Sequence, residues 1–323
     1  MSNKIRIILI IVLVFIYSSA ECAFSYWLWT SETKRWINPK HAPKDTPKEQ
    51  LLYAMDFYEE GDCKKALGEF KKIIKYYKRS EAASEAQYYM GLCYEKLNKP
   101  YPAFEAYQKV VDDYPFTQRV DQIIEKQFNI GEKLFEGGKT KVLGVGFKAF
   151  PEQIIEVYKK VVSNAPYSKY APIAQYRIGE LYKRVEFYRE AQEAFEKIVE
   201  DYPDSDVAAD AKFQVAFCAS VASGKSGYDQ ELTEEAIREF EEFANQHPDS
   251  ELVKDALDEK RQLVDKRANS YFKIAKFYER VGKYESASLY YNKIMEEFPQ
   301  ASVLPDSVER LGVVEKKLSR KRR

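Results

Sequence analysis

The sequence is poor in the residues that build metal and catalytic sites. Its 323 residues include only two histidines, His41 and His247, and four cysteines. This scarcity argues against zinc fingers, haem sites and histidine-based catalysis. The charge is also balanced, with 51 Lys and Arg against 51 Asp and Glu, so the basic surface of a nucleic-acid-binding protein is not expected. We therefore predict no metal, no cofactor and no nucleic-acid partner.

Long apolar runs are lacking too, with one exception at the start of the chain. After two basic residues, ten apolar residues run from Ile7 to Ile16 and lead into small residues that end at Ala20. This order is that of a secretory signal peptide, and the run is shorter than the about 20 residues that span a bilayer. We predict a signal peptide over residues 1–20 and export across a membrane. An uncleaved anchor is the alternative.

The cysteines have no Cys-x-x-Cys spacing. Cys63, Cys93 and Cys218 fall within helical patterns, where a thiol is usually a small buried apolar group. Cys22 lies where a bacterial lipoprotein carries its acylated cysteine, but Glu21 stands where that signal has a small residue. Lipidation of Cys22 and a disulfide between Cys63 and Cys93 both stay open for an exported chain.

Residues 21–47 form an N-terminal segment rich in Trp and Pro. It holds all three tryptophans of the chain, Trp27, Trp29 and Trp36. Alternation around residues 31–34 predicts a short hairpin, and three prolines then predict an extended linker. The aromatic side chains fit an anchor at a membrane interface or in a partner groove. A flap packed on the following domain is the alternative.

Residues 48–302 repeat one pattern. A first helix carries a small residue, a second helix carries Ala with an aromatic residue four positions later, and a Pro closes the unit. Three copies keep identical spacing: Gly91, Ala103, Tyr107, Pro115; Gly179, Ala191, Phe195, Pro203; and Ala275, Ala287, Tyr291, Pro299. A weaker copy contains Ala54, and two copies with insertions contain Gly131 and Ala216.

This pattern resembles the tetratricopeptide repeat, in which small residues let paired helices approach and a Pro ends the second helix. One helix pair cannot bury such an aromatic face, so neighbouring repeats must stack. We predict an all-α fold, a right-handed superhelical solenoid of about six repeats. Residues 303–323 are predicted to form a capping helix and a basic tail, with the cap buried through Val308, Leu311, Val314 and Leu318. The tail is either solvated or in contact with anionic lipid.

In this fold the residue three positions before the small residue faces a groove. Five of these six positions are aromatic: Leu51, Tyr88, Phe128, Tyr176, Phe213 and Phe272. Met55, Tyr58 and Phe135 fall on further groove positions, with Lys96 nearby. Aromatic rings edged by cations suit an extended peptide with apolar side chains and a carboxylate. The alternative is that these rings only pack between adjacent repeats.

The candidate catalytic motif in the sequence is incomplete. The run Gly138-Lys139-Thr140 mimics the end of a phosphate-binding loop, but Lys133 occupies the position of the required earlier glycine. Four glycines within residues 137–150 instead predict a flexible insertion that serves as a contact loop. We predict that the protein is not an enzyme, with an unrecognised site in a closed cavity as the alternative.

A stretch near the end of the repeats resembles the BamD family, the tetratricopeptide lipoproteins of outer-membrane β-barrel assembly, and the resemblance extends over roughly residues 48–300. The residues that carry the resemblance run to Phe298-Pro299 and include Asp255, Ala256, Arg261, Leu263, Arg267, Ala268, Tyr271, Ile274, Ala275, Phe277, Tyr278, Glu279, Arg280 and Gly282. The insertion Leu143-Gly144-Val145-Gly146-Phe147 is also similar to one in that family.

The resemblance implies an exported, non-enzymatic adaptor at the periplasmic face of the outer membrane, with peripheral membrane contact. Its first two repeats would receive targeting segments of unfolded β-barrel outer-membrane proteins, through Met55, Tyr58, Tyr88, Leu92 and Lys96. Its later repeats would dock a β-barrel assembly subunit through Phe272, Lys276 and Arg280. The alternative is a periplasmic scaffold for cell division or cell-wall synthesis that resembles the CpoB group. Proteins of that group carry a coiled coil before their repeats, and residues 21–47 show no heptads.

Overall fold

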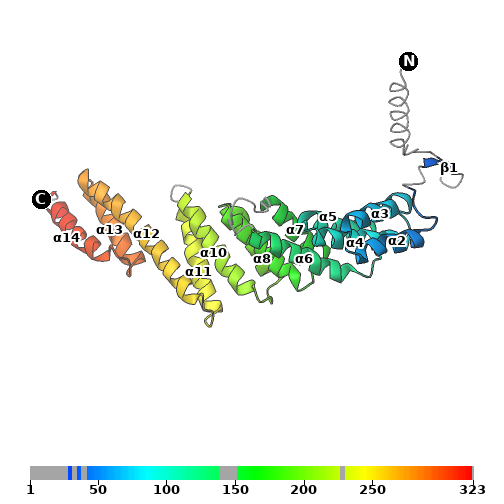
Figure 1. Ribbon diagram of the computed structural model, residues 1–323. Coiled ribbons are helices and arrows are strands. Elements are labelled where there is room, and N and C mark those ends of the chain that lie inside the picture. The colour runs from blue at the N-terminus through cyan, green and yellow to red at the C-terminus, as the bar shows by residue number, and fades with distance from the viewer. Residues whose placement is uncertain (1–27, 31–34, 38–41, 138–150, 226–229, 322–323) are drawn as a thin grey trace, which may run out of the picture. The chain divides into compact units, whose positions relative to one another are not determined.

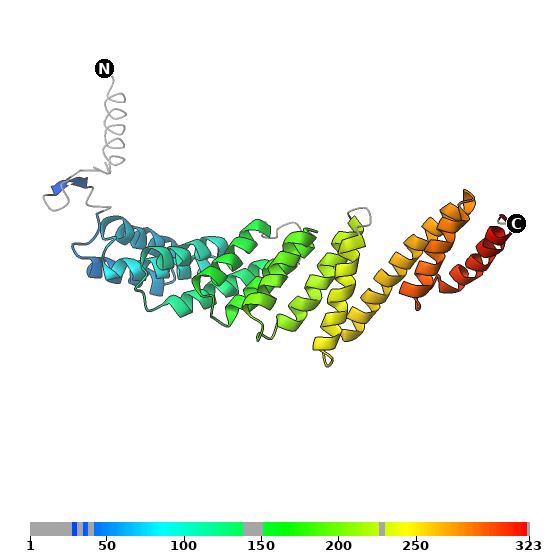
Figure 2. The same ribbon diagram turned by 180° about the vertical axis from the view of Figure 1, so that it is seen from behind.

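The computed structural model describes residues 28–30, 35–37, 42–137, 151–225 and 230–321 (Figures 1 and 2). Within these residues the chain forms one two-stranded sheet and thirteen α-helices, which confirms the all-α class. The predicted signal peptide, Cys22, Trp27 and nearly all of the Gly-rich insertion lie outside the described residues. No helix in the described part is long and apolar enough to cross a membrane.

The predicted hairpin is present near the N-terminus. Strands β1 (Leu28–Thr30) and β2 (Arg35–Ile37) pair antiparallel, with Trp29 opposite Trp36. The two indole rings meet edge to face with centroids 5.9 Å apart. Cross-strand ring pairs of this kind stabilise a hairpin that would otherwise be marginal.

The first compact unit ends within α5, at Val110, and contains the first two helix pairs. Its helices are α2 (Pro47–Glu59), α3 (Cys63–Tyr76), α4 (Glu81–Lys96) and α5 (Pro100–Asp113). Helix α2 begins where the linker was predicted to end. The Thr46 hydroxyl accepts a hydrogen bond from the Glu49 amide at 3.2 Å, and Pro47 occupies the first turn, where its missing N–H costs nothing.

The second compact unit contains four further helix pairs and a terminal helix. Its helices are α6 (Val120–Gly137), α7 (Pro151–Asn164), α8 (Tyr170–Arg184), α9 (Tyr188–Asp201), α10 (Ala208–Lys225), α11 (Gln230–Gln246), α12 (Val253–Arg280), α13 (Tyr284–Glu297) and α14 (Leu304–Lys321). The pairs α2/α3 to α12/α13 correspond to the six predicted repeats. Helix α12 reaches 28 residues because no Gly or Pro interrupts the sequence between Pro248 and Gly282.

The turns within four helix pairs share one backbone feature. The seventh residue after the small position has a positive φ in each: Gly61 (83°), Asn98 (53°), Glu186 (63°) and Gly282 (74°). This left-handed conformation ends a helix and is natural for Gly and Asn but strained for Glu. The shared geometry supports the register in which the sequence copies were aligned.

Helix α14 caps the last pair as predicted. Leu311 and Val314 are buried in one cluster with Ala287 and Tyr291, and Leu318 packs against it. Val308 is exposed. The basic run at the C-terminus was predicted to be a tail, but in the structure helix α14 continues through it to Lys321. Helical geometry carries the Lys317 Nζ to 3.6 Å from a Glu279 carboxylate oxygen.

Candidate functional site

The small residue of each repeat determines how the groove-facing positions lie. A Cβ added to Gly91 would lie 2.3 Å from Tyr107 Cε1, and one added to Gly179 would lie 2.6 Å from Phe195 Cε1. The aromatic ring of the second helix therefore lies directly against the backbone of the first helix. Such a contact leaves no room for a larger side chain.

The predicted groove rings pack onto these second-helix rings. Five pairs repeat along the chain with centroids 5.1 to 6.2 Å apart: Tyr88 with Tyr107, Phe128 with Tyr158, Tyr176 with Phe195, Phe213 with Phe240, and Phe272 with Tyr291. One side of each predicted groove ring is therefore covered by the second-helix ring of the same repeat. Only the part of the ring that stays exposed can contact a ligand.

In the first unit, six predicted groove residues come from α2 and α4: Leu51, Met55, Tyr58, Tyr88, Leu92 and Lys96. The Lys96 ammonium lies 3.7 Å from the centre of the Tyr58 ring, which is a cation–π contact that joins the two helices. Tyr88 is only 6% exposed, whereas Lys96 is exposed and Tyr58 is half-buried. The accessible part of this face is therefore Lys96 with the flanking surfaces of Met55, Tyr58 and Leu92. We call it the first-unit groove.

In the second unit, three of the predicted rings are buried as Tyr88 is in the first. Phe128 and Phe213 are each 9% exposed and Phe135 is 1% exposed, while Tyr176 is half-buried. The guanidinium groups of Arg177 and Arg184 lie 4.8 and 4.3 Å from the centre of the Phe135 ring. Arginine side chains therefore cover the ring that was predicted to line this part of the groove.

Arg177 is the centre of a polar network that joins α6, α7 and α8. Its guanidinium donates to both carboxylate oxygens of Glu132, at 2.9 and 3.0 Å, and to Glu180 at 2.6 Å. The Tyr158 hydroxyl donates to the same Glu132 at 2.6 Å. Burial opposes the charged form of Arg177, but the hydrogen bonds to the two glutamates raise its pKa. Burial and the bond to Glu132 likewise raise the pKa of Tyr158. The network is a rigid, charged element rather than an aromatic surface.

The predicted docking residues Lys276 and Arg280 line a basic pocket of about 630 Å³ between α12, α13 and α14. No sequence pattern predicted the rest of its lining, which comprises Lys273, Phe277, Glu279, Tyr284, Arg310 and Lys317. Phe272 lies beside it, with the Lys276 ammonium 5.5 Å from its ring centre.

The charge of the basic pocket is uneven. Glu279 accepts from the Tyr291 hydroxyl at 3.1 Å, and Arg310 and Lys317 lie 3.5 and 3.6 Å from one of its carboxylate oxygens. Within the described residues, no ion pair involves Lys273, Lys276 or Arg280. The pocket thus presents an excess of positive charge beside exposed aromatic carbon, and it suits an acidic ligand.

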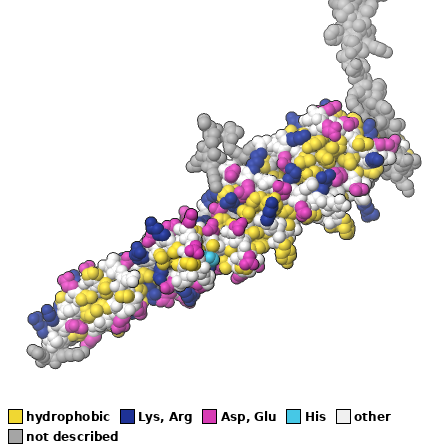
Figure 3. Space-filling model, turned by 90° about the horizontal axis from the view of Figure 1, so that it is seen from below, with side chains coloured by type: hydrophobic (Ala, Val, Ile, Leu, Met, Phe, Trp, Pro, Cys, Tyr) yellow, Lys and Arg dark blue, Asp and Glu magenta, His cyan; other side chains and the backbone are white. Residues whose placement is uncertain are grey.

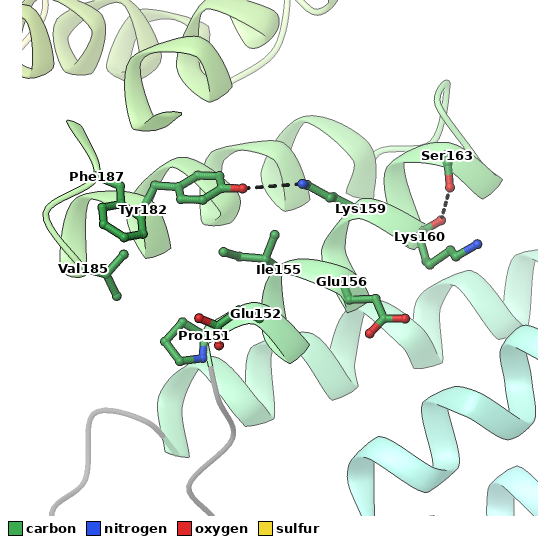
Figure 4. A pocket seen from close by; sticks show the side chains of 10 residues that line it. All are labelled: Pro151, Glu152, Ile155, Glu156, Lys159, Lys160, Ser163, Tyr182, Val185 and Phe187. Atoms are coloured by element: carbon green, nitrogen blue, oxygen red, sulfur yellow. Dashed lines mark hydrogen bonds between the residues drawn. The ribbon is translucent and has the colours of Figure 1, made fainter. Parts of the chain in front are cut away.

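A second pocket, of about 540 Å³, is apolar and lies between α7 and the end of α8 (Figure 4). Ile155, Tyr182, Val185 and Phe187 contribute its apolar walls, and the Lys159 ammonium donates to the Tyr182 hydroxyl at 3.5 Å at its rim. No motif predicted this pocket, because its residues come from two repeats.

On the face of the molecule drawn in Figure 3, apolar side chains are interspersed with side chains of both signs of charge.

The three cysteines in the described part of the chain lie in the interior. Cys63, Cys93 and Cys218 are buried free thiols, as predicted. Burial and the neighbouring Cys63 raise the pKa of Cys93 to about 12, and burial raises that of Cys218 to about 12. In the described ranges, no group of three His, Cys, Asp or Glu side chains is placed to hold a metal.

Comparisons with known proteins agree with this architecture. A family model described as "Outer membrane lipoprotein" matches residues 216–322, the third of the chain that contains the basic pocket. A tetratricopeptide repeat model matches residues 85–117 and 173–205, which are α4 with α5 and α8 with α9. No curated protein matches the chain significantly.

Several solved structures are similar at low identity. A tetratricopeptide repeat protein from Parabacteroides merdae is 17% identical, with 83% of this chain and 98% of that chain covered and a TM-score of 0.32. The C-terminal part of a repeat protein from Cytophaga hutchinsonii is 19% identical over 82% and 88% of the two chains, with a TM-score of 0.36. YrrB, a repeat protein described as having an unusual peptide-binding site, is 15% identical over 68% and 94%, with a TM-score of 0.32. The repeat-model matches and the helix pairs of the described residues show that the protein contains tetratricopeptide repeats, and its C-terminal third is similar to the outer membrane lipoprotein family.

Proposed function

We propose that the protein is an exported, non-enzymatic adaptor of the BamD type. It binds unfolded outer-membrane proteins and a β-barrel assembly subunit at the periplasmic face of the outer membrane. The observation that carries this proposal is the match of residues 216–322 to the outer membrane lipoprotein family, because that region also contains the basic pocket. Tetratricopeptide repeats generally bind peptides and proteins, which fits an adaptor.

The first-unit groove is the proposed receptor for the unfolded substrate. Lys96 is a cation at the edge of half-buried apolar surface on Met55, Tyr58 and Leu92. An extended peptide with an apolar side chain close to a carboxylate would place the carboxylate on Lys96 and the side chain on Tyr58. Contacts of this size, after ordering costs, give affinities of about 1 µM. The deeper rings, including Tyr88, support the groove from below.

Within the second unit, the positions Phe128, Phe135, Tyr176 and Phe213 are proposed as a separate peptide-contacting surface. Since their rings are largely covered, contact there would come from the polar side chains above them. The guanidinium groups of Arg177 and Arg184 over Phe135 are of this kind. A carboxylate-bearing segment fits this surface better than a purely apolar one.

The basic pocket is the proposed docking point of the β-barrel assembly subunit. Lys276 and Arg280 are exposed and have no ion-pair partner in the described residues, so an acidic segment of a partner can reach them. Phe272 beneath Lys276 adds apolar surface. Charge reversal by Lys276→Glu with Arg280→Glu is expected to abolish docking and leave helix content unchanged.

The test is site-specific photo-crosslinking in living cells. A photoreactive residue at Lys96 should capture β-barrel precursors, and one at Lys276 should capture the assembly subunit. Exposed lysines on other helix faces, Lys64 in α3 and Lys254 at the start of α12, serve as matched controls. Capture of cell-wall synthases or division proteins at Lys96 would instead support the scaffold alternative, and equal capture at control positions would remove both assignments.

A further inference from the structure

Both tryptophans of the N-terminal hairpin are exposed. Trp29 is 54% exposed and Trp36 is 62% exposed, although their rings contact each other at 5.9 Å. Residues directly opposite in an antiparallel pair point to the same face of the sheet. The strand register therefore presents two indole rings side by side on one face of β1 and β2. This arrangement differs from a flap whose rings are buried on the first repeat.

The composition of the surrounding sequence distinguishes a lipid surface from a protein groove. All tryptophans of the chain lie at or before residue 36, and none occurs in the repeats. From Trp27 to Lys40 there are three cations, Lys34, Arg35 and Lys40, against one acid, Glu32, in a chain whose total charge is zero. Indole rings with neighbouring cations are the composition favoured at the interface of an anionic bilayer, where the ring is buried and its N–H stays hydrated.

The position of the hairpin in the chain also favours a lipid surface as its binding partner. The only long apolar run, which ends at Ile16, precedes Trp29 by thirteen residues. Cys22 precedes it by seven. Fully extended, these distances are at most about 45 Å and 25 Å. If either element is held in a membrane, the hairpin is tethered within reach of the same surface, which raises its effective concentration there.

We infer that Trp29 and Trp36 form an interfacial anchor that inserts both indole rings into the headgroup region of an anionic phospholipid bilayer. The anchor holds the start of the repeat domain at the membrane through the linker that ends at Thr46. This inference concerns a lipid surface and does not depend on which proteins the grooves bind.

The sequence makes the anchor directly measurable, because tryptophan fluorescence reports on this segment alone. The full chain with Trp27→Phe retains only the hairpin pair. On addition of vesicles of phosphatidylethanolamine and phosphatidylglycerol, its emission is expected to shift to shorter wavelength. Vesicles with bromine-labelled acyl chains are expected to quench it.

A matched control places one indole elsewhere. In a chain with all three tryptophans replaced by Phe, Tyr167→Trp puts the ring at a turn where the native side chain is 100% exposed. Its emission should not respond to vesicles. A response equal to that of the hairpin pair would mean general adsorption and would overturn the inference.

Two further outcomes would also overturn it. The first is hairpin emission that stays at its value in buffer while vesicles are present in excess. The second is a shift that requires a purified protein partner and does not occur with vesicles. Circular dichroism of the Trp29→Ser, Trp36→Ser chain checks that the helices are intact, and this variant should bind the same vesicles more weakly in flotation than the chain that keeps both indole rings.

Discussion

Gly91 is the position where the structure makes its sharpest energetic prediction. A methyl group added there would lie 2.3 Å from Tyr107 Cε1 and 2.6 Å from Cζ. The Tyr107 ring cannot easily withdraw, because it is fully buried, its hydroxyl is bound to the Glu95 carboxylate, and the Tyr88 ring packs against it at 5.7 Å. We therefore expect Gly91→Ala to destabilise the first unit.

The magnitude follows from two opposing terms. Overpacking a well-filled core costs about 1–3 kcal/mol, and an overlap this close falls at the upper end. Replacing Gly by Ala inside a helix returns about 1 kcal/mol. The net loss in the free energy of unfolding is therefore about 2 kcal/mol, and Gly91→Leu should cost more. Gly68 in α3 is the matched control, since a methyl group there would contact nothing within 4 Å, so Gly68→Ala should stabilise by up to about 1 kcal/mol.

The assay is urea denaturation followed by circular dichroism and by tyrosine fluorescence. Opposite signs for Gly91→Ala and Gly68→Ala are the expected result. A midpoint for Gly91→Ala at or above that of the unaltered chain would refute the close-contact argument and the repeat alignment behind it. A double-mutant cycle with Tyr107→Leu identifies the cause, because the cost of Gly91→Ala should nearly vanish once the ring is removed.

Four further predictions follow from the same structure. Glu186→Gly should raise stability by about 0.5–1 kcal/mol in urea melts, because its φ of 63° is strained for Glu, and a loss would contradict the assigned turn. Arg177→Met should lower stability by about 1–3 kcal/mol, since it leaves the Glu132 carboxylate without its bidentate partner, and an unchanged urea midpoint would count against the network. Cys93, whose pKa is raised to about 12, should resist iodoacetamide in the native chain and react in urea, as mass spectrometry would show. Burial raises the pKa of Tyr176 from 10 to about 12, so the folded state keeps a proton that the unfolded chain loses. Stability should therefore be complete below pH 10 and fall as the pH rises to about 12, and tyrosinate absorbance with a single midpoint near 10 in the folded protein would contradict this.

Much of the fold could be predicted because the repeat signal is local. The spacing from Gly179 to Ala191 to Pro203 reflects contacts within one helix pair, and the six predicted pairs are present, with the shared turn at the same position in the four pairs whose turns the structure describes. The hairpin around residues 31–34 and the helix start after Thr46 also follow from neighbouring residues alone. Local backbone preferences and side-chain periodicity act over distances that a single sequence displays directly.

Four buried glutamines were not predicted from the local sequence pattern. Gln50, Gln87, Gln127 and Gln175 each lie four positions before the small residue of their repeat. The side-chain amides of Gln87 and Gln175 donate to the backbone carbonyls of Ala106 and Ala194 in the partner helix, at 3.1 and 2.9 Å. Their identical spacing was present in the sequence and could have been found. A buried glutamine amide that links two helices can be predicted only once a backbone carbonyl of the partner helix is known to lie opposite it.

The sequence by itself determined the helix pairs, the capping helix and the composition of the groove-facing positions, because these depend on residues within one repeat. Only the tertiary structure decided which surfaces are available. It placed the second-helix rings under Tyr88 and Phe213, laid Arg177 over Phe135, and brought Lys317 from α14 beside Arg280 from α12. Burial and charge clustering arise between side chains of different helices, so they depend on packing that no local pattern encodes.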